Sequence, residues 1–585
     1  MQNPLALSKV NPLLRWALNK LTRLHVLRDW YDEWLAGGKE NRGAPAFLDY
    51  TLSKLGVSLS VDNPERLQAV PSHGPLIVVA NHPLGGLEGM LLSRLLLSQR
   101  SDLKVMANDM LLAFPEFSDL FIGVDVLNPA RQQSNARGLR QASQHLANGG
   151  ALLVFPAGTV SRLKLPGMRI EDEPWLPMIG RLAIKYKAAC LPIYISNRNS
   201  LWFYFSDYIH KRLRTLLLPR AMLAKRDTTV AATIGHALYC DQLPPPVTAG
   251  GLMQYLRVSC ELLGDQSWLQ KPESQNRQRM IEKVISPMLL QEQMARLESY
   301  CVDRQGNHAV YCAPFEQLGC VAEQLAIERE RTFRAAGEGT GLERDRDRFD
   351  PHYWHVWAWD HAATKLIGGY RAANISEVMQ QQGLNGLYSH SLFHYDEAFI
   401  QALGGAIEVG RSFVCVDYQR NLRALDLLWR GIGAFVVQNP DCHTLFGCVS
   451  ISRRYSPLAR ALLADTLLTN HTADSNIRLL VRPISPLSTQ DRPWDRALMA
   501  TLSSVAIINK LLGHSDAENR VPTLIRHYLS LNGKFIDFSL NHGFNEALDG
   551  LIMVDLRLAP QKYLDRYLGK PEAKSFLETW RQHVA

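Results

Sequence analysis

The sequence contains no long apolar run. No window approaches the roughly 18 uncharged apolar residues that a membrane-spanning helix requires. The first 30 residues mix charged side chains among the leucines, whereas a secretory signal needs an unbroken apolar stretch. We therefore expect a protein that is soluble or peripheral to a membrane.

The sequence also has few cysteines and no long run of Lys and Arg. The nine cysteines are scattered, with no CxxC pair and no zinc-like spacing, so we expect reduced thiols and no metal site. The 64 Lys+Arg exceed the 56 Asp+Glu by only eight, and no long basic run accompanies them. This balance argues against a nucleic-acid partner but leaves room for an acidic protein or an anionic bilayer.

The composition fits several folded domains. Of the 585 residues, 46% are hydrophobic and 21% charged, which excludes wholesale disorder. Short apolar runs alternate with amphipathic ones, a pattern typical of α/β layers. We predict an N-terminal helical membrane-contact region (1–69), an α/β domain (70–260), a linker (261–285) and a second, mixed-sheet α/β domain (286–585).

The N-terminal stretch is amphipathic. Leucine and tryptophan alternate with Lys and Arg at helical spacing, as at Leu14, Trp16, Leu18 and Leu21. Such a helix either packs on its own domain or lies on a membrane surface.

A histidine and an acid follow the first predicted buried strand. The strand 76–80 ends at Ala80, and Asn81, His82 and Glu88 come next, with a Gly-Gly pair between the last two. The glycines permit a reversal that brings Glu88 back to the imidazole, and a carboxylate on one ring nitrogen makes the other a better proton acceptor. Taken alone, His82 could equally be a turn residue.

A second block follows another predicted strand, 151–155. Phe-Pro-Ala-Gly-Thr-Val-Ser-Arg over 155–162 offers backbone N–H groups, two hydroxyls and a guanidinium, a suitable cradle for an anion or carbonyl. Together, the two blocks resemble the NHxxxxD and FPEGTRS blocks of the glycerolipid acyltransferase family, and most closely its hemolysin-like, lyso-ornithine-lipid branch. The resemblance implies the family's α/β fold.

That resemblance also implies residue roles. His82 would be the general base and Glu88 its orienting acid, while Asn81, Gly158, Thr159, Ser161 and Arg162 would bind substrate. Two departures matter: Glu88 lies one residue further from His82 than in HxxxxD, and Ala157 replaces the Glu of FPEGT. The second departure favours a phosphate-free lysolipid acceptor.

The C-terminal half carries a different set of blocks. Glu408, Gly410 and Arg411 fall on a predicted strand, where an edge ion pair is the simplest explanation. Their surroundings, including blocks at 328–333, 349–351, 367–371 and 445–450, resemble the ornithine N-acyltransferase family, which is related to acyl-homoserine-lactone synthases and has a GNAT-like fold. The resemblance implies Glu408 as base, with Arg411 orienting it or binding an acceptor carboxylate.

The acyl donor is predicted from a missing loop. The Q/RxxGxG/A sequence that binds the coenzyme A pyrophosphate is absent, because 419–424 reads Gln-Arg-Asn-Leu-Arg-Ala. We therefore expect no bound cofactor and an acyl carrier protein as donor. Its acidic face would dock on Arg420, Arg423, Arg430, Arg453 and Arg454. The alternative is that these arginines only form a solvated basic face.

As a whole, the chain resembles the bifunctional ornithine-lipid synthases. The C-terminal domain would attach a 3-hydroxyacyl group to the α-amine of ornithine, and the N-terminal domain would then esterify the hydroxyl of that lysolipid. Two alternatives are open: a lysophosphatidate acyltransferase with an accessory domain, and a non-catalytic membrane-binding protein. The identity of the amino acid rests on the resemblance alone.

Overall fold

A computed structural model describes residues 3–5, 11–37, 43–124, 132–165, 168–243, 247–264, 278–421, 423–488, 492–516 and 519–581. These residues divide into two compact units. Unit 1 falls within Met1–Gln266, Pro493–Thr501 and Lys510–Ala517, and unit 2 within Ser267–Arg492, Leu502–Asn509 and Glu518–Ala585. The polar part of the predicted linker, 271–277, lies outside the described residues.

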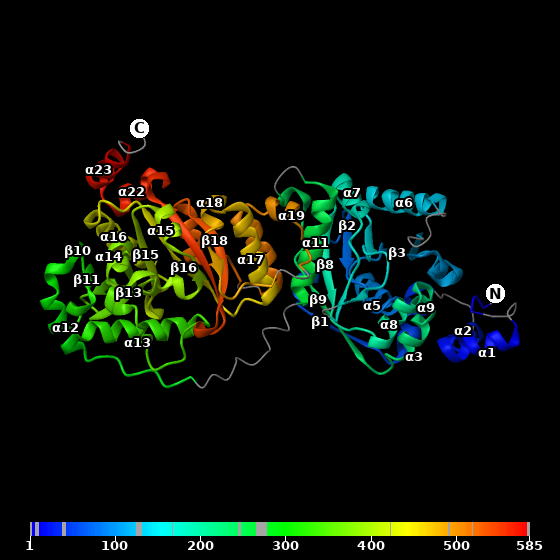
Figure 1. The fold of residues 1–585 in the computed structure, drawn as a ribbon. Helices are drawn as coiled ribbons and strands as arrows, with labels where there is room; N and C mark the ends of the chain where they lie inside the picture. Colours follow the sequence, from blue (N-terminus) through cyan, green and yellow to red (C-terminus); the bar gives the residue numbers. More distant parts are fainter. Residues whose placement is uncertain are drawn as a thin grey trace. The chain divides into compact units, whose positions relative to one another are not determined.

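Unit 1 is built on a mostly parallel sheet of order β1-β9-β8-β2-β5-β3-β4 (Figure 1). Only the β8–β9 pair is antiparallel. The strands are β1 (Ser58–Asp62), β2 (Leu76–Ala80), β3 (Lys104–Asn108), β4 (Phe121–Val124), β5 (Ala151–Val154), β8 (Ala189–Ile195) and β9 (Thr229–Ile234). All five β2 side chains are buried because helices cover both sheet faces, as continuous apolar runs in parallel sheets require.

Helices from both ends of the unit complete this core. Helices α2 (Leu24–Ala36) and α3 (Ala44–Leu55) bury Tyr31, Trp34 and Leu48 in the same cluster as β2 and α5 (Gly86–Leu97). α6 (Gln132–Ala147), α7 (Pro177–Tyr186) and α11 (Ala249–Gly264) also pack in this unit. Part of the region predicted as a separate 1–69 segment therefore shares the core of the α/β domain.

Unit 2 contains an eight-stranded mixed sheet of order β10-β11-β12-β13-β15-β16-β19-β18 (Figure 1). Its strands are β10 (Cys301–Gln305), β11 (His308–Pro314), β12 (Trp354–Asp360), β13 (Lys365–Asn374), β15 (Ala406–Val414), β16 (Thr444–Ile451), β18 (Lys534–Asn541) and β19 (Ala547–Asp555). Helices α13 (Cys320–Ala335) and α16 (Ala424–Gln438) pack against the sheet. The predicted mixed α/β class is confirmed for both units.

The only parallel pair in this sheet is also its shortest. β15 pairs with β16 only at 406–408 against 444–446, and beyond Glu408 and Phe446 each strand keeps only its other neighbour, β13 for β15 and β19 for β16. Because both strands continue, each to its own partner, they diverge at this point. Beyond this point the β15–β16 ladder no longer pairs the backbone groups that the two strands turn toward each other.

Candidate functional site

His82 and Glu88 form a direct pair in unit 1. The Nδ1 atom of His82 lies 2.9 Å from Oε1 of Glu88, and the Glu88 side chain is fully buried. The same carboxylate oxygen accepts the N–H groups of Leu84 and Gly85, each at 2.9 Å. Glu88 is the third residue of α5 and folds back over Gly85, whose φ of +95° suits glycine. The contact between His82 and Glu88 therefore forms although the two residues are one position further apart than in HxxxxD.

The histidine ring remains accessible on its other side. The side chain is 18% exposed, and its ring stacks on Phe155 at 4.4 Å between centroids. With Nδ1 held by a carboxylate, Nε2 is the nitrogen that is available to accept a proton. The pair thus has the arrangement that general-base activation of a hydroxyl requires.

Sheet topology brings the two sequence blocks together. β2 and β5 are adjacent and parallel, so the segments that follow them leave the same edge of the sheet. The N–H of Ser161 donates to the carbonyl of His82 at 2.8 Å. Asn81 anchors the segment after β2 to β8, because its side-chain amide exchanges two hydrogen bonds with the backbone of Ile195 at the end of β8.

A second buried acid, Asp172, joins these blocks and was not predicted. Its carboxylate accepts the N–H of His82 at 3.2 Å, the hydroxyl of Ser161 at 2.6 Å and the indole N–H of Trp175 at 3.0 Å. Burial raises the pKa of Asp172. No family block contains this residue, and an aspartate in a polar loop gives no sequence signal of its own.

The predicted substrate-binding residues differ in whether their polar groups already have partners within the protein. Gly158 adopts a φ of +68° and its N–H donates to Phe155, and both donors of Ser161 are engaged. Arg162 pairs with Glu173 at 2.9 Å and Asp207 at 3.3 Å. Among the described residues, the buried Thr159 hydroxyl has no hydrogen-bond partner. Thr159 is therefore the member of the set that has a polar side-chain group to spare.

In unit 2, Glu408 is buried and held by three donors. Its carboxylate accepts the N–H of Tyr388 at 3.0 Å, the N–H of Ser389 at 2.7 Å and the hydroxyl of Tyr353. Such a carboxylate fixes the turn at 388–391 against β15. Three of its roughly four lone-pair sites are occupied, which leaves it little capacity to take a proton from a substrate.

Arg411 contacts other acids rather than Glu408. It lies at a bulge in β15 opposite β13, where the register shifts, and has the left-handed φ of +48°. Its guanidinium meets Asp345 at 3.2 Å, Asp347 at 3.3 Å and the Tyr388 hydroxyl at 3.3 Å. Tyr388 thus connects the two predicted residues, since its N–H binds Glu408 and its hydroxyl binds Arg411.

Arg411 belongs to a closed ring of alternating charges. Each of three arginines contacts two of three aspartates, at distances of 2.7–3.3 Å, so the six buried or largely buried groups neutralise one another. The Arg371 guanidinium also lies 5.0 Å from the Tyr353 ring centre and 5.1 Å from that of Tyr388. The ring members, in order, are Arg329, Asp345, Arg411, Asp347, Arg371 and Asp350.

The ring fixes the loop between α13 and β12. Arg371 and Arg411 hold the pKa of Asp347 below its usual value although burial opposes them, and Arg329 and Arg371 do the same for Asp350. Removing one partner of such a buried pair typically costs about 3–5 kcal/mol. The blocks at 328–333, 349–351 and 367–371 each supply ring members, but their spacing in sequence does not reveal the closed arrangement.

Glycine at the strand divergence has a steric reason. A Cβ atom on Gly447, the first β16 residue beyond the pairing, would lie 2.0 Å from the carbonyl oxygen of Val409. A Cβ on Gly410 would meet nothing within 4 Å. Of the two features that a glycine at 410 permits, a bulge lies directly after Gly410, whereas the close backbone approach occurs at Gly447.

The predicted docking arginines are not equivalent. Arg420, Arg423 and Arg454 are exposed, whereas Arg430 pairs with Asp426 at 3.5 Å and Asp303 at 3.8 Å. Arg430 therefore offers the least unbalanced charge to an acidic partner.

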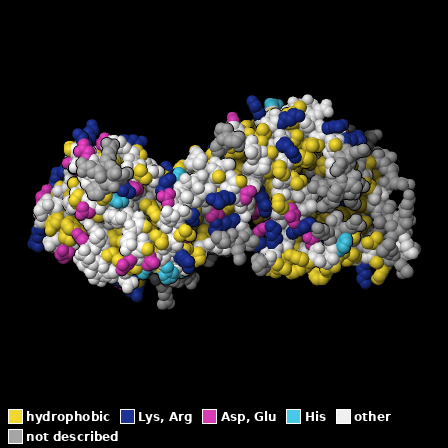
Figure 2. Space-filling model, turned by 45° about the horizontal axis from the view of Figure 1, so that its top comes forward, with side chains coloured by type: hydrophobic (Ala, Val, Ile, Leu, Met, Phe, Trp, Pro, Cys, Tyr) yellow, Lys and Arg dark blue, Asp and Glu magenta, His cyan; other side chains and the backbone are white. Residues whose placement is uncertain are grey.

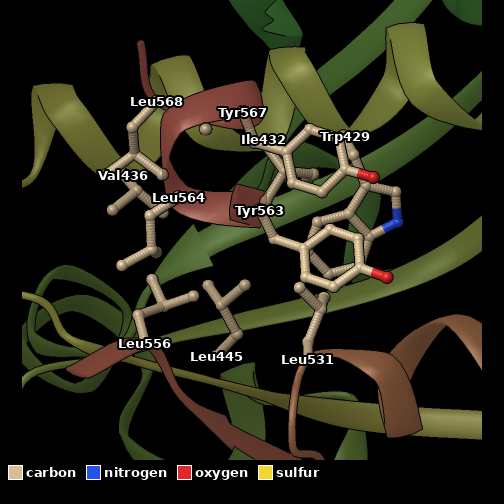
Figure 3. Close-up of a pocket in the computed structure, with 11 residues that line it drawn as sticks. Trp429, Ile432, Val436, Leu445, Leu531, Leu556, Tyr563, Leu564, Tyr567 and Leu568 are labelled. Carbon is tan, nitrogen blue, oxygen red and sulfur yellow. The ribbon is translucent and has the colours of Figure 1, made fainter. Parts of the chain in front are cut away.

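A small apolar pocket lies against α16 (Figure 3). Its lining is apolar and aromatic, and includes Trp429, Leu445, Tyr563 and Tyr567. Leu445 belongs to the paired part of β16, and no member of the charged ring lines the pocket. Its volume of about 10 Å³ is too small for an acyl chain, and it offers no acid–base chemistry.

Comparison with known proteins gives two domain matches. Residues 41–247 match an acyltransferase family model, and residues 329–430 match an acetyltransferase (GNAT) domain. The chain is an acyltransferase. Its acyltransferase domain lies in unit 1 and its GNAT domain in unit 2.

The relatives of this acyltransferase carry two different names. A glycine N(alpha)-acyltransferase of Bacteroides thetaiotaomicron is 28% identical over 292 residues, which is 47% of this chain and 86% of the relative. A lyso-glycine lipid O-acyltransferase of the same organism is 27% identical over 221 residues, 36% of this chain and 77% of the relative. The crystal structure of a 1-acyl-sn-glycerophosphate acyltransferase from Thermotoga maritima is 20% identical, covering 37% of this chain and 75% of that one, with a TM-score of 0.24.

Proposed function

We propose that this chain carries out two successive acyl transfers on one amino acid. Unit 2 would acylate the α-amine with a 3-hydroxyacyl group, and unit 1 would then esterify the free hydroxyl of that lysolipid. The observation that carries the proposal is that one chain resembles both an N-acyltransferase and a lysolipid O-acyltransferase from a single organism. Joining the two sites keeps the single-chain intermediate at a high effective concentration near the second.

The geometry of unit 1 supports the O-acyl step. Nε2 of His82 would take the proton of the lysolipid hydroxyl as its oxygen attacks the thioester carbonyl, while Glu88 stabilises the resulting imidazolium. The C–O bond forms, the C–S bond breaks, and the thiolate leaves with the proton. Thr159, with its unpaired hydroxyl, is the predicted substrate-binding residue best placed to donate to the substrate.

The divergence of β15 and β16 supports the N-acyl step. Unpaired backbone N–H groups at such an opening are suitable donors for the oxyanion of a tetrahedral intermediate. Glu408 and Arg411 would act there by positioning, through Tyr388 and the charged ring, rather than by direct contact with each other.

Two acceptors compete within this proposal. Ornithine follows from the resemblance of the sequence blocks, and glycine follows from the names of the relatives. Ornithine would need a site for a second ammonium group, and glycine would not. Neither the charged ring nor the turn at 388–391 decides between them, since all their charges are paired internally.

We further propose acyl carrier protein as donor and the cytoplasmic membrane surface as the place of action. Exposed Arg420, Arg423 and Arg454 could meet an acidic carrier. Helix α8 (Leu201–Ile209) exposes large apolar side chains, including Trp202 at 69% and Ile209 at 66%, and Figure 2 shows apolar and basic side chains interspersed on the visible surface. Within the described residues, no helix combines the length and apolarity needed to cross a bilayer.

Purified protein with defined acceptors tests the proposal. We expect N-acylation of glycine or ornithine from 3-hydroxyacyl carrier protein, and O-acylation of the matching lysolipid. Coenzyme A thioesters at equal concentration should react more slowly. Acylation of lysophosphatidate alone, with no acylation of either amino acid, would favour the alternative of a glycerophospholipid acyltransferase with an accessory domain.

A further inference from the structure

Most acids near the divergence of β15 and β16 are already engaged. Glu408 accepts three hydrogen bonds, and the aspartates of the charged ring each pair with two arginines. Asp549 on β19 accepts the hydroxyl of Ser450 at 2.5 Å and the amide of Asn541 at 2.7 Å. A general base must bring a lone pair to the substrate proton, and a carboxylate that several protein donors hold in place is less able to do so.

Glu338 meets that requirement. Its carboxylate is partly buried and forms no hydrogen bond or ion pair with the described part of the chain, whereas its N–H donates to Phe333 at 2.8 Å. The residue lies in the loop after α13, between Gly337 and Gly339, whose φ angles are +81° and +102°. Glycines at these angles let the chain present Glu338 from a tight turn.

The position of this loop is fixed from both sides. The carbonyl of Ala336 accepts the hydroxyl of Ser452, just beyond the end of β16, at 2.7 Å. The carbonyl of Gly337 accepts the amide of Asn545 at 3.0 Å. On the far side, the buried Glu330 carboxylate accepts the N–H of Thr340 at 3.0 Å. The loop is therefore held at the end of the diverging strand.

Titratable and charged groups from β15, from β19 and from the segment after β16 face Glu338. Arg411 comes from β15, Asp549 from β19 beside β16, and Arg454 and Tyr455 from the segment after β16. Burial, followed by the negative charge of Asp549, raises the pKa of Glu338 to about 8 against the opposing effect of Arg411 and Arg454. A carboxylate of this kind accepts protons near neutral pH more readily than an ordinary one.

We propose that Glu338 is the general base of the N-acyl transfer in unit 2. This inference rests on the proposed function of that unit. The carboxylate removes one proton from the acceptor ammonium group, and the free amine attacks the thioester carbonyl. A C–N bond forms and the C–S bond breaks. The second amine proton leaves with the thiolate, and Glu338 returns its proton to water.

Steady-state kinetics of the full chain from pH 6 to 10 test this role. Glu338→Gln should lower kcat for N-acylation by about 10²–10⁴-fold with KM nearly unchanged, and should remove the rise in wild-type rate through pH 8. Glu343→Gln, the same change at an exposed position of the same loop, should match wild type. O-acylation by the same samples reports whether unit 1 is intact, and thermal unfolding reports the folding of unit 2.

The outcomes are distinguishable. A Glu338→Gln variant within threefold of wild type, or one that is slower but retains the rise through pH 8, would overturn the role of Glu338. A wild-type protein that acylates no amino acid at any pH would instead overturn the function proposed for unit 2. Glu408→Gln provides a further comparison: loss of the pH 8 rise in that variant alone would assign the base to Glu408.

Discussion

At the scale of single residues, His82 and Glu88 carry the chemistry proposed for unit 1. Their 2.9 Å contact depends on the buried carboxylate that two backbone N–H groups hold in place. We predict that His82→Ala lowers O-acylation by about 10²–10⁴-fold, the usual contribution of general-base catalysis, while N-acylation continues. Measuring both products by mass spectrometry in one reaction checks this. His73→Ala, at an exposed histidine of the same unit, is the matched control; equal loss of both activities in His82→Ala would contradict the assignment.

Sequence blocks identified this pair but not all of its surroundings. The residues that follow β2 and β5 were predictable because a buried apolar strand followed by Gly, Pro and polar residues marks the edge of an α/β sheet. Asp172, in contrast, meets His82 only through the fold, and Glu338 lies in a glycine-rich loop that resembles a simple turn. The same holds for the charged ring, whose three arginines come from α13, β13 and β15 and meet three aspartates of one loop.

At the scale of elements, the divergence of β15 from β16 is the feature that shapes unit 2. We predict that Gly447→Ala destabilises the unit and lowers N-acylation, because the added methyl group would overlap the Val409 carbonyl. Gly410→Ala, on the facing strand with open space around it, should change the free energy of unfolding by about 1 kcal/mol or less. Thermal unfolding and N-acylation rates check both; equal effects of the two substitutions would show that the close approach is unimportant.

Helix α8 provides an element-scale test of membrane contact. We predict that Trp202→Ser combined with Ile209→Ser weakens sedimentation with anionic phospholipid vesicles several-fold, because about 25 cal/mol is lost per Å² of apolar surface removed from the bilayer. Leu479→Ser, at a position that is 79% exposed in unit 2, should leave vesicle binding unchanged. Unaltered binding of the double variant would place the contact elsewhere on the chain.

Element boundaries show where periodicity is informative and where it is not. Strands of continuous apolar residues, such as β2 and β16, were predicted within one or two residues. The apolar run from Met90 to Leu97 predicts a helix, and the observed α5 begins earlier, at Gly86, because the Glu88 carboxylate caps it. The edge strands β1 and β18 escaped prediction, since tertiary pairing rather than local preference decides them.

At the scale of the whole molecule, buried neutral histidines make stability depend on pH. Burial lowers the pKa of His355 and His527 to about 4 and that of His514 to about 3, whereas an unfolded histidine titrates near 6.5. As the pH falls, the unfolded chain therefore binds protons before the folded chain does. The stability that the neutral histidines contribute is complete above about pH 6.5 and is lost on the way to pH 4.

We accordingly predict a falling unfolding temperature from pH 6.5 to 4.5. His355→Gln should reduce that slope, whereas His542→Gln, at a side chain that is 62% exposed, should not. Differential scanning calorimetry across this range measures both. An unfolding temperature that stays constant over the range would contradict the neutral state assigned to these histidines.

One measurement tests both acyl transfers: mass spectrometry of lipids from a host that makes no aminolipids of its own and expresses this chain. Wild type should yield an amino acid lipid with two acyl chains, whose mass identifies glycine or ornithine. His82→Ala should yield the same amino acid with one hydroxyacyl chain. Absence of any acylated amino acid from cells that contain folded wild-type protein would contradict the two-step account.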